Sequence, residues 1–300
     1  MSATLLAQLT HRARETHSDG FTILHRGEVL PDHSFARTDE PVCIMSVTKM
    51  VVALAFGRLL DDGILSSLDT PVAGIFPEWR QGRKRDVTIR MVLNHTSGVQ
   101  NDPNAGIEIE PSPDWNRLAL CAELEADPGT VFAYNNKAVQ LLAPIIERLA
   151  GQPLDAYLRD TLLLPLGITG ETWIRDPAGT PFAAGGLHLR ASDLAKVGQL
   201  ILDRGTWQGQ RIISDEWIVT MTSPGQTFRR DFGLLCRLWL DKDRERLVGI
   251  YHDGWMGQYL VVLPEQRIVI ARLLARSPGF EPETHGFLDI LDLSRFLAEA

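Results

Sequence analysis

The apolar stretch from Val47 to Leu60 constrains the fold of this chain more than any other segment. Its hydrophobic residues occupy nearly every side of a helix, so the helix that they predict must be buried on most of its surface. Lys49 lies inside this stretch and has no water around it there. Its amine must therefore be paired, or held neutral by desolvation and a nearby positive charge. An Asp-Asp-Gly sequence at 61–63 ends the predicted helix.

Ser46 stands three residues before Lys49 in the sequence Ser-Val-Thr-Lys. Residues i and i+3 share one face of a helix, so we expect the lysine amine beside the serine hydroxyl. A serine hydroxyl is a poor nucleophile at neutral pH and needs a neighbour that takes its proton. Taken alone the tetrapeptide is weak evidence, because most such matches are helix starts with a surface lysine.

The composition narrows the function classes. A chain of 300 residues with 44% hydrophobic residues can bury a full-size core. Its net charge of −8 argues against nucleic acid or an anionic membrane as a partner. Three widely spaced cysteines and no stretch of membrane-spanning length favour a reducing, cytoplasmic location. The histidines and cysteines follow no ligand spacing, so we expect neither a metal nor a cofactor.

Strand patterns lie near both ends of the chain and helix patterns lie between them. The predicted strands are at 21–30, 42–45, 232–240, 247–251, 259–263 and 267–274. The predicted helices are at 2–16, 88–94, 137–150 (bent at Pro144), 154–163, 192–202 capped by Ser192, 214–221 capped by Ser214, and 283–298. Residues 99–117 are expected to form a long loop, and loops of this length often serve as lids over functional sites.

These patterns predict an α+β fold in which both termini build one antiparallel sheet that helices flank. We expect the sheet domain to comprise 1–62 and 210–300, and a mostly helical domain to comprise 63–209. The helix after Ser46 would then lie at the seam of the two domains, where pockets commonly form.

A second motif supplies polar groups that Ser46 and Lys49 lack. Pro128-Gly129-Thr130 turns the chain toward Tyr134-Asn135-Asn136. A tyrosine whose pKa a nearby lysine lowers can act as a general base and then as a general acid. Asn136 could donate a hydrogen bond to a substrate carbonyl. The alternative is structural: a packed tyrosine ring followed by an asparagine that caps a helix.

A third motif, His252-Asp253-Gly254-Trp255, lies between two predicted strands. Glycine lets a strand's backbone approach a ligand closely. The backbone amide of Trp255 could then join that of Ser46 as the second donor of an oxyanion hole. The alternative is a glycine-rich hairpin with an incidental histidine.

Together and in this order, the three motifs resemble the class C β-lactamase-like serine hydrolases, whose signatures are S-x-x-K, Y-x-N and K/H-x-G. The resemblance runs from about residue 20 to about residue 275. It also includes three accessory segments: 93–98 (Leu-Asn-His-Thr-Ser-Gly), 128–130 (Pro-Gly-Thr), and 184–187 (Ala-Gly-Gly-Leu) leading to 192–194 (Ser-Asp-Leu). We interpret His95, in the first of these, as a supporting residue behind the site.

The resemblance implies a β-lactamase/transpeptidase-like fold and a serine hydrolase that cleaves a small ester or amide through an acyl-enzyme. Ser46, Lys49 and Tyr134 would be catalytic, and Asn136 and Gly254 would contact the substrate. His252 would also contact it, but it stands where β-lactamases carry lysine. It therefore removes a charge that receives a substrate carboxylate and favours an esterase or amidase.

Other functions stay open at this point. Within the same enzyme class they are a weak β-lactamase, a D-amino-acid or DD-peptidase, and an acyltransferase. From another class, the chain could be a non-catalytic module that keeps the penicillin-binding shape. Trp115, in the predicted loop, and Trp255 are candidates for the walls of the substrate site. Whether Tyr134 or Lys49 is the formal base is also open, because coupled groups titrate as a pair.

Overall fold

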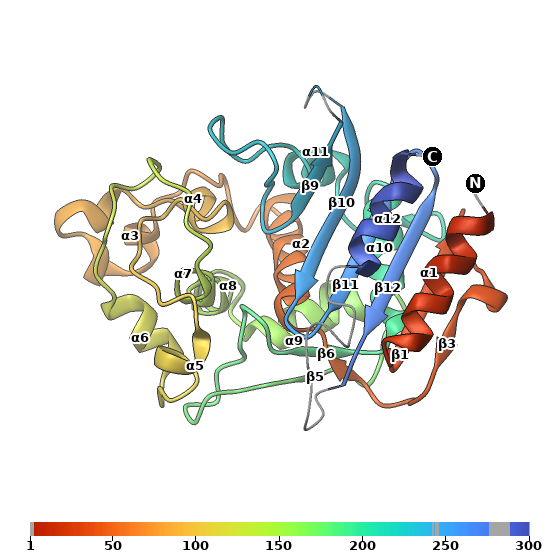
Figure 1. Cartoon of the computed structure of the whole chain (residues 1–300). Helices are drawn as coiled ribbons and strands as arrows, with labels where there is room; N and C mark the ends of the chain where they lie inside the picture. The colour runs from red at the N-terminus through yellow and green to blue at the C-terminus, as the bar shows by residue number, and fades with distance from the viewer. Residues whose placement is uncertain (1–2, 242, 244–245, 276–288, 300) are drawn as a thin grey trace.

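One antiparallel sheet is made from both ends of the chain, and in Figure 1 it stands between α1 on the right and the helical part of the molecule on the left. The computed structural model describes residues 3–241, 243, 246–275 and 289–299. The strands follow the spatial order β2-β1-β12-β11-β10-β9, and β3 pairs with the other end of β1. Their bounds are β1 Gly20–His25, β2 Glu28–Val29, β3 Phe35–Ala36, β9 Arg237–Leu240, β10 Leu247–Gly254, β11 Gln258–Leu263 and β12 Ile268–Leu273. This confirms the predicted α+β fold and the sheet shared by the two termini.

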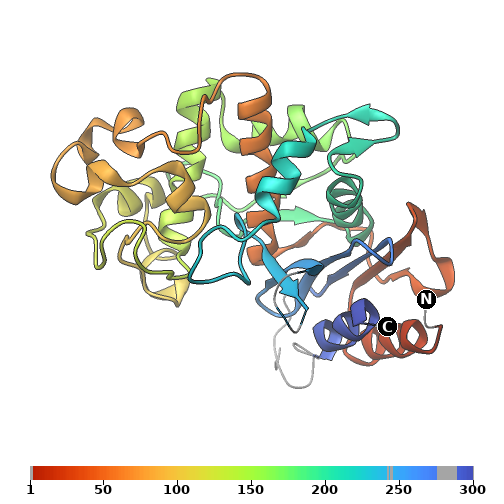
Figure 2. The ribbon, with the colours of Figure 1, turned by 90° about the horizontal axis from the view of Figure 1, so that it is seen from above.

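Helices cover both faces of this sheet (Figure 2). Alternate residues of β11 and β12 enter different cores: Val261 and Ile270 pack with α1 (Ala3–Glu15), whereas Val262 and Val269 pack with α10 (Ala191–Leu202). Successive side chains of a strand point to opposite faces, so continuous apolar strands need a layer of helix on each side. Helix α12 (Asp289–Glu299) lies beside α1 on the first face.

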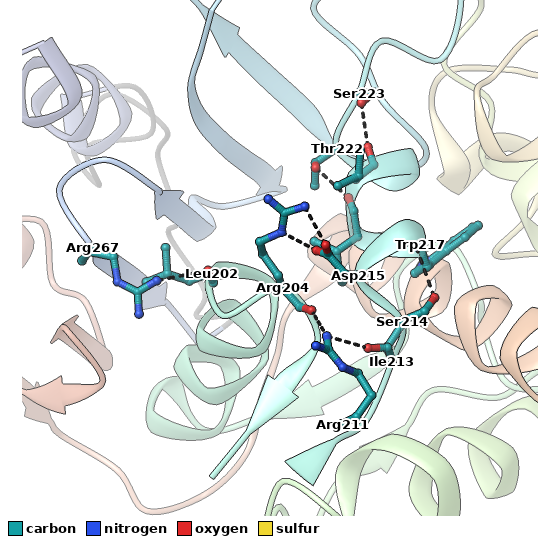
Figure 3. A network of polar contacts seen from close by, with 12 residues as sticks. Leu202, Arg204, Arg211, Ile213, Ser214, Asp215, Trp217, Thr222, Ser223 and Arg267 are labelled. Carbon is teal, nitrogen blue, oxygen red and sulfur yellow. Dashed lines mark hydrogen bonds and ion pairs between the residues drawn. The ribbon is translucent and has the colours of Figure 1, made fainter. Parts of the chain in front are cut away.

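Helix α2 (Thr48–Asp61) runs through the centre of the larger core, as its apolar sequence predicted. Helix α11 (Asp215–Met221) packs against it so closely that a Cβ at Gly57 would lie 2.3 Å from the Trp217 ring. Figure 3 shows how the start of α11 is held. The Ser214 hydroxyl accepts a hydrogen bond from the Trp217 amide at 3.3 Å, and Arg204 forms an ion pair with Asp215. Ser214 is thus the cap that the sequence predicted.

The remaining elements form the helical side of the molecule and two small sheets. The helices are α3 Val72–Ile75, α4 Ile89–Leu93, α5 Ala105–Glu108, α6 Trp115–Cys121, α7 Asn136–Gln140, α8 Leu142–Ala150 and α9 Leu154–Leu158. Short turns of 3-10 helix are η1 Pro31–His33, η2 Met45–Val47, η3 Pro77–Trp79 and η4 Gly82–Asp86, and η5 Arg159–Leu163 is a π-helical turn. The small strands are β4 Val42–Cys43, β5 Thr172–Trp173, β6 Leu187–Leu189, β7 Thr206–Trp207 and β8 Gln210–Arg211.

Several predicted boundaries need correction. The helix predicted at 137–150 is two helices that break at Leu141, because the ring of Pro144 cannot fit beside the carbonyl four residues earlier. The predicted loop at 99–117 contains α5 and the start of α6. Helix α10 begins at Ala191 after Arg190, so Ser192 is not its cap. The helix predicted at 283–298 is described from Asp289, and its earlier part lies outside the described residues.

The predicted division into a sheet domain and a helical domain stays a prediction. Helix α10 lies in the range assigned to the helical domain, yet it packs on β1, β11 and β12. None of the helices in the described ranges is long and apolar enough to cross a membrane.

Candidate active site

Ser46 lies on the 3-10 turn η2, immediately before α2 rather than inside it. The turn is tied to β6 by the amide of Ile44, which donates to the Leu187 carbonyl at 2.9 Å. Met45 has a φ of 48°, in the left-handed region that non-glycine residues rarely adopt. Such backbone strain is concentrated at functional sites, where the surrounding structure enforces it. The turn thus holds Ser46 at the edge of the core with its neighbours fixed on both sides.

Lys49 approaches Ser46 as its spacing predicted. Its Nζ lies 3.1 Å from the Ser46 Oγ and donates to the Ala184 carbonyl oxygen at 2.5 Å. The side chain is completely buried. The pKa of Lys49 is lowered to about 7. Burial is the main cause; the charge of Asp253 raises this pKa, and the charge of Arg237 lowers it. Near neutral pH a large fraction of this lysine is therefore an uncharged amine, which is the form a general base needs.

Tyr134 completes the group around Ser46, because it shares a side-chain hydrogen bond with this serine. The Lys49 Nζ also lies 4.9 Å from the centre of its ring. The expectation that a lysine lowers the pKa of Tyr134 is wrong. Burial raises that pKa above its usual value, and Asp253 adds to the effect. Tyr134 therefore keeps its proton at neutral pH, and Lys49 is the better base of the two.

His95 supports Tyr134 from behind through three contacts on successive residues. Its carbonyl accepts from the Ala133 amide at 2.9 Å, and its Nδ1 accepts from the Asn135 amide at 3.1 Å. Its ring lies against the Tyr134 ring, with 4.6 Å between the centres. A φ of 59° turns His95 so that its carbonyl and its ring reach the same segment. Burial drives the pKa of His95 well below its usual range, so the ring is neutral and can accept.

His252 lies beside Tyr134, with 6.3 Å between the two ring centres, rather than on the wall of the cavity. Its side chain is completely buried, it is absent from the cavity wall, and its Nδ1 lies 2.7 Å from the Asp253 carbonyl. Burial, together with the charges of Lys49 and Arg237, drives the pKa of His252 well below its usual range. The imidazole is therefore neutral at pH 7. We expect no direct contact with a substrate and no positive charge from it.

Gly254 ends β10 where this strand meets η2, the turn that carries Ser46 and is called the serine turn below. A Cβ on this residue would lie 2.7 Å from the Ile44 carbonyl oxygen and 3.0 Å from the Met45 Cβ. Since such distances are shorter than atomic contact allows, only glycine lets β10 approach the turn this closely. Trp255 follows directly, with its side chain about half exposed at the cavity.

A cavity of about 670 Å³ opens above these groups, and this volume is typical of small-molecule sites. Ser46, Tyr134, Asn136 and Trp255 all line it. The buried Oδ1 of Asn136 has no hydrogen-bond partner among the described residues. Residues 103–106 of the predicted lid also line the cavity, whereas Trp115 does not.

Trp115 lies behind the wall, with its ring 4.9 Å from that of Phe182, which does line the cavity.

Sequence reasoning missed an ion pair beside the site: Arg237 at the start of β9 and Asp253 lie 2.5 Å apart. Both residues act on the pKa of Lys49 and of Tyr134. Asp253 stood within the third motif, but no signal pointed to Arg237, which comes close only when β9 pairs with β10.

The comparisons with known proteins agree with this arrangement. The model of the family described as "Beta-lactamase" matches residues 6–294. The chain belongs to the beta-lactamase family. A 6-aminohexanoate-dimer hydrolase of Paenarthrobacter ureafaciens is 30% identical over 98% of this chain and 82% of its own length. Esterase EstB of Burkholderia gladioli is 33% identical over 50% of this chain and 43% of its own.

The comparison with solved structures supports the fold. The crystal structure of a penicillin-binding protein from Bacillus halodurans superposes with a TM-score of 0.76 over 99% of this chain and all of the other, at 17% identity. Together with the relatives named 6-aminohexanoate-dimer hydrolase and esterase, the match to the beta-lactamase family identifies the chain as a serine hydrolase.

Proposed function

We propose that this serine hydrolase cleaves small carboxylic esters or amides through an acyl-enzyme on Ser46. One observation carries the proposal: a completely buried Lys49, with a pKa of about 7, lies 3.1 Å from the Ser46 hydroxyl at the wall of a cavity. A lysine held on the surface would stay charged and could not take a proton. The compartment that fits best is the cytoplasm, since Cys43, Cys121 and Cys236 are all free.

Acylation begins when the uncharged amine of Lys49 takes the proton of Ser46. The Ser46 Oγ forms a bond to the substrate carbonyl carbon, and the carbonyl oxygen becomes an oxyanion. When this intermediate collapses, the bond from carbon to the leaving alcohol or amine breaks. The Tyr134 hydroxyl gives the leaving group its proton and regains one from the protonated Lys49. Because burial raises the pKa of Tyr134, its hydroxyl is protonated at neutral pH and has a proton to give.

The backbone amides of Ser46 and Trp255 are the donors for the oxyanion. The contact of Gly254 with Ile44 and Met45 brings the segment of Trp255 against the serine turn, which supports this assignment. A single donor of this kind contributes about 2.7–4 kcal/mol to the stability of the transition state in enzymes where it has been removed. Water then attacks the acyl-enzyme, with Lys49 taking its proton, and the carboxylic acid product leaves.

An esterase or amidase fits this cavity better than a β-lactamase. The residue in the position of the β-lactamase lysine is His252, which is completely buried and neutral. The carboxylate of a β-lactam would therefore meet no cation from this motif. The relatives that cleave an aminohexanoate dimer or carry the name esterase are in line with this choice.

The test is covalent labelling by a fluorophosphonate, followed by intact-protein mass spectrometry, with wild type and Ser46→Ala side by side. We expect one adduct on wild type and none on the variant. A panel of a p-nitrophenyl ester, an anilide and nitrocefin then ranks ester, amide and β-lactam cleavage. Equal labelling of both proteins would place the nucleophile elsewhere, and no labelling of either would favour a non-catalytic binding module.

A further inference from the structure

The wall of the catalytic cavity carries one charged side chain among the residues that the structure describes, and it is an acid. Glu110 lines the same cavity as Ser46 and Tyr134. Its Oε2 would lie 3.7 Å from a Cβ built on Gly106, another residue of that wall. The carboxylate itself, and not only its stem, therefore lies at the cavity.

Glu110 differs from its neighbour Glu108 in having no structural partner. Glu108 pairs with the buried Lys137 at 2.7 Å and accepts a hydrogen bond from the Asp102 amide at 3.2 Å. Among the described residues, no ion pair or hydrogen bond involves the carboxylate of Glu110. Glu108 thus holds the loop together, whereas the charge of Glu110 is open to a ligand.

Among the described residues that line the cavity, none is a cation that could balance Glu110. Lys49 is completely buried behind Ser46, and burial keeps much of it uncharged at neutral pH. His252 is buried and neutral, and Arg237 is paired with Asp253. An incoming substrate therefore meets a negative charge without a positive one, which favours cations and disfavours carboxylates.

Asn136 adds a second acceptor to the same cavity. Its Oδ1 is buried without a hydrogen-bond partner in the described part of the chain. Buried polar atoms are usually satisfied, so this oxygen is suited to a donor that arrives with a ligand. An N–H group on the substrate supplies such a donor, and a carboxylate does not.

We propose that the cavity selects ester or amide substrates that carry an ammonium or guanidinium group, and that Glu110 is the residue that binds this group. The inference rests on the proposed function, because it names the substrate class of the same site. The bond that is cleaved is unchanged, and Glu110 takes no part in proton transfer. It is a specificity-determining residue.

The test compares esters of equal shape and different charge. One pair is acetylcholine, the acetate ester of choline, and its neutral analogue, in which carbon replaces the quaternary nitrogen. The other pair places the same trimethylammonium or tert-butyl group on the acyl chain of a p-nitrophenyl ester. The measured quantity is the ratio of kcat/KM for the cationic and the neutral member of each pair. Wild type, Glu110→Gln and the control Glu28→Gln are compared, Glu28 being an exposed acid on β2.

We expect wild type to prefer the cationic ester in at least one pair by about two- to fivefold at low salt, as for an exposed ion pair. Glu110→Gln should bring this ratio close to one, while Glu28→Gln keeps it. The preference should shrink in 1 M NaCl, where the screening length is about 3 Å. A ratio of one in wild type for both pairs, or an unchanged ratio in Glu110→Gln, would overturn the inference although ester cleavage stands. Cleavage of neither member by wild type would overturn the proposed function and the inference with it.

Discussion

Replacing Gly254 by alanine tests how the oxyanion site is assembled. The new Cβ would lie 2.7 Å from the Ile44 carbonyl oxygen and 3.0 Å from the Met45 Cβ. Carbon atoms in favourable contact are about 3.5–4.0 Å apart, so β10 and the serine turn must separate by roughly 0.5–1 Å. This movement carries the amide of Trp255 away from that of Ser46.

A misplacement of about 1 Å near a reacting centre can reduce the rate by about 100-fold. We therefore expect kcat of Gly254→Ala on a p-nitrophenyl ester to fall by about 10- to 100-fold, with a smaller change in KM. The matched control is Gly74→Ala. Gly74 has ordinary backbone angles, and a Cβ there would meet no atom within 4 Å.

Thermal unfolding of both variants separates misplacement from loss of fold. The expected pattern is a folded Gly254→Ala with reduced kcat, and a Gly74→Ala with wild-type kcat. Wild-type kcat in Gly254→Ala would refute the view that close approach of β10 sets the oxyanion donors. Unfolding of Gly254→Ala below the assay temperature would show instead that the contact serves the fold first.

Two further predictions concern the proton-transfer groups. Because Lys49 must be neutral to accept the Ser46 proton, kcat/KM should rise with pH through about 7, its pKa. Arg237→Gln removes a positive charge that lowers this pKa, so the rise should move to higher pH. An unmoved profile would exclude Lys49 as the titrating base. His95→Phe keeps a ring beside Tyr134 but removes the acceptor for the Asn135 amide, and kcat should fall about tenfold with little change in KM. A change in KM alone would contradict a positioning role.

The sequence predicted those parts of the fold that depend on the spacing of nearby residues along the chain. The apolar periodicity of 47–60 predicted the central helix, and the alternation near both termini predicted one shared sheet. The three-residue spacing of Ser46 and Lys49 predicted their contact, even though Ser46 lies on a 3-10 turn. The long polar stretch at 99–117 was harder to predict, since α5 and α6 depend on the caps Asn104 and Asp114 within an otherwise irregular sequence.

Features that depend on distant segments could not be predicted in this way. The Ala184 carbonyl accepts from Lys49 across 135 positions of sequence, and a backbone carbonyl carries no sequence signal. The burial of His252 follows from the packing of β10 against the serine turn and the strands beside it. The pKa values followed burial as well: burial lowers that of Lys49, for which the sequence left a paired and a neutral state open, and raises that of Tyr134, against expectation.

The pairing of β1 with β12 has a consequence for the order of biosynthesis. Gly20 lies opposite Leu273, so the strand β1 has no β12 to pair with until Leu273 has been synthesised. At about 5–20 residues per second, ribosomal synthesis imposes a delay on the order of tens of seconds. Ser46, Lys49 and Tyr134 all emerge during this interval, but the hairpin of Gly254 that completes their pocket does not. A nascent chain should therefore gain its reactivity only after the strands up to Leu273 have emerged.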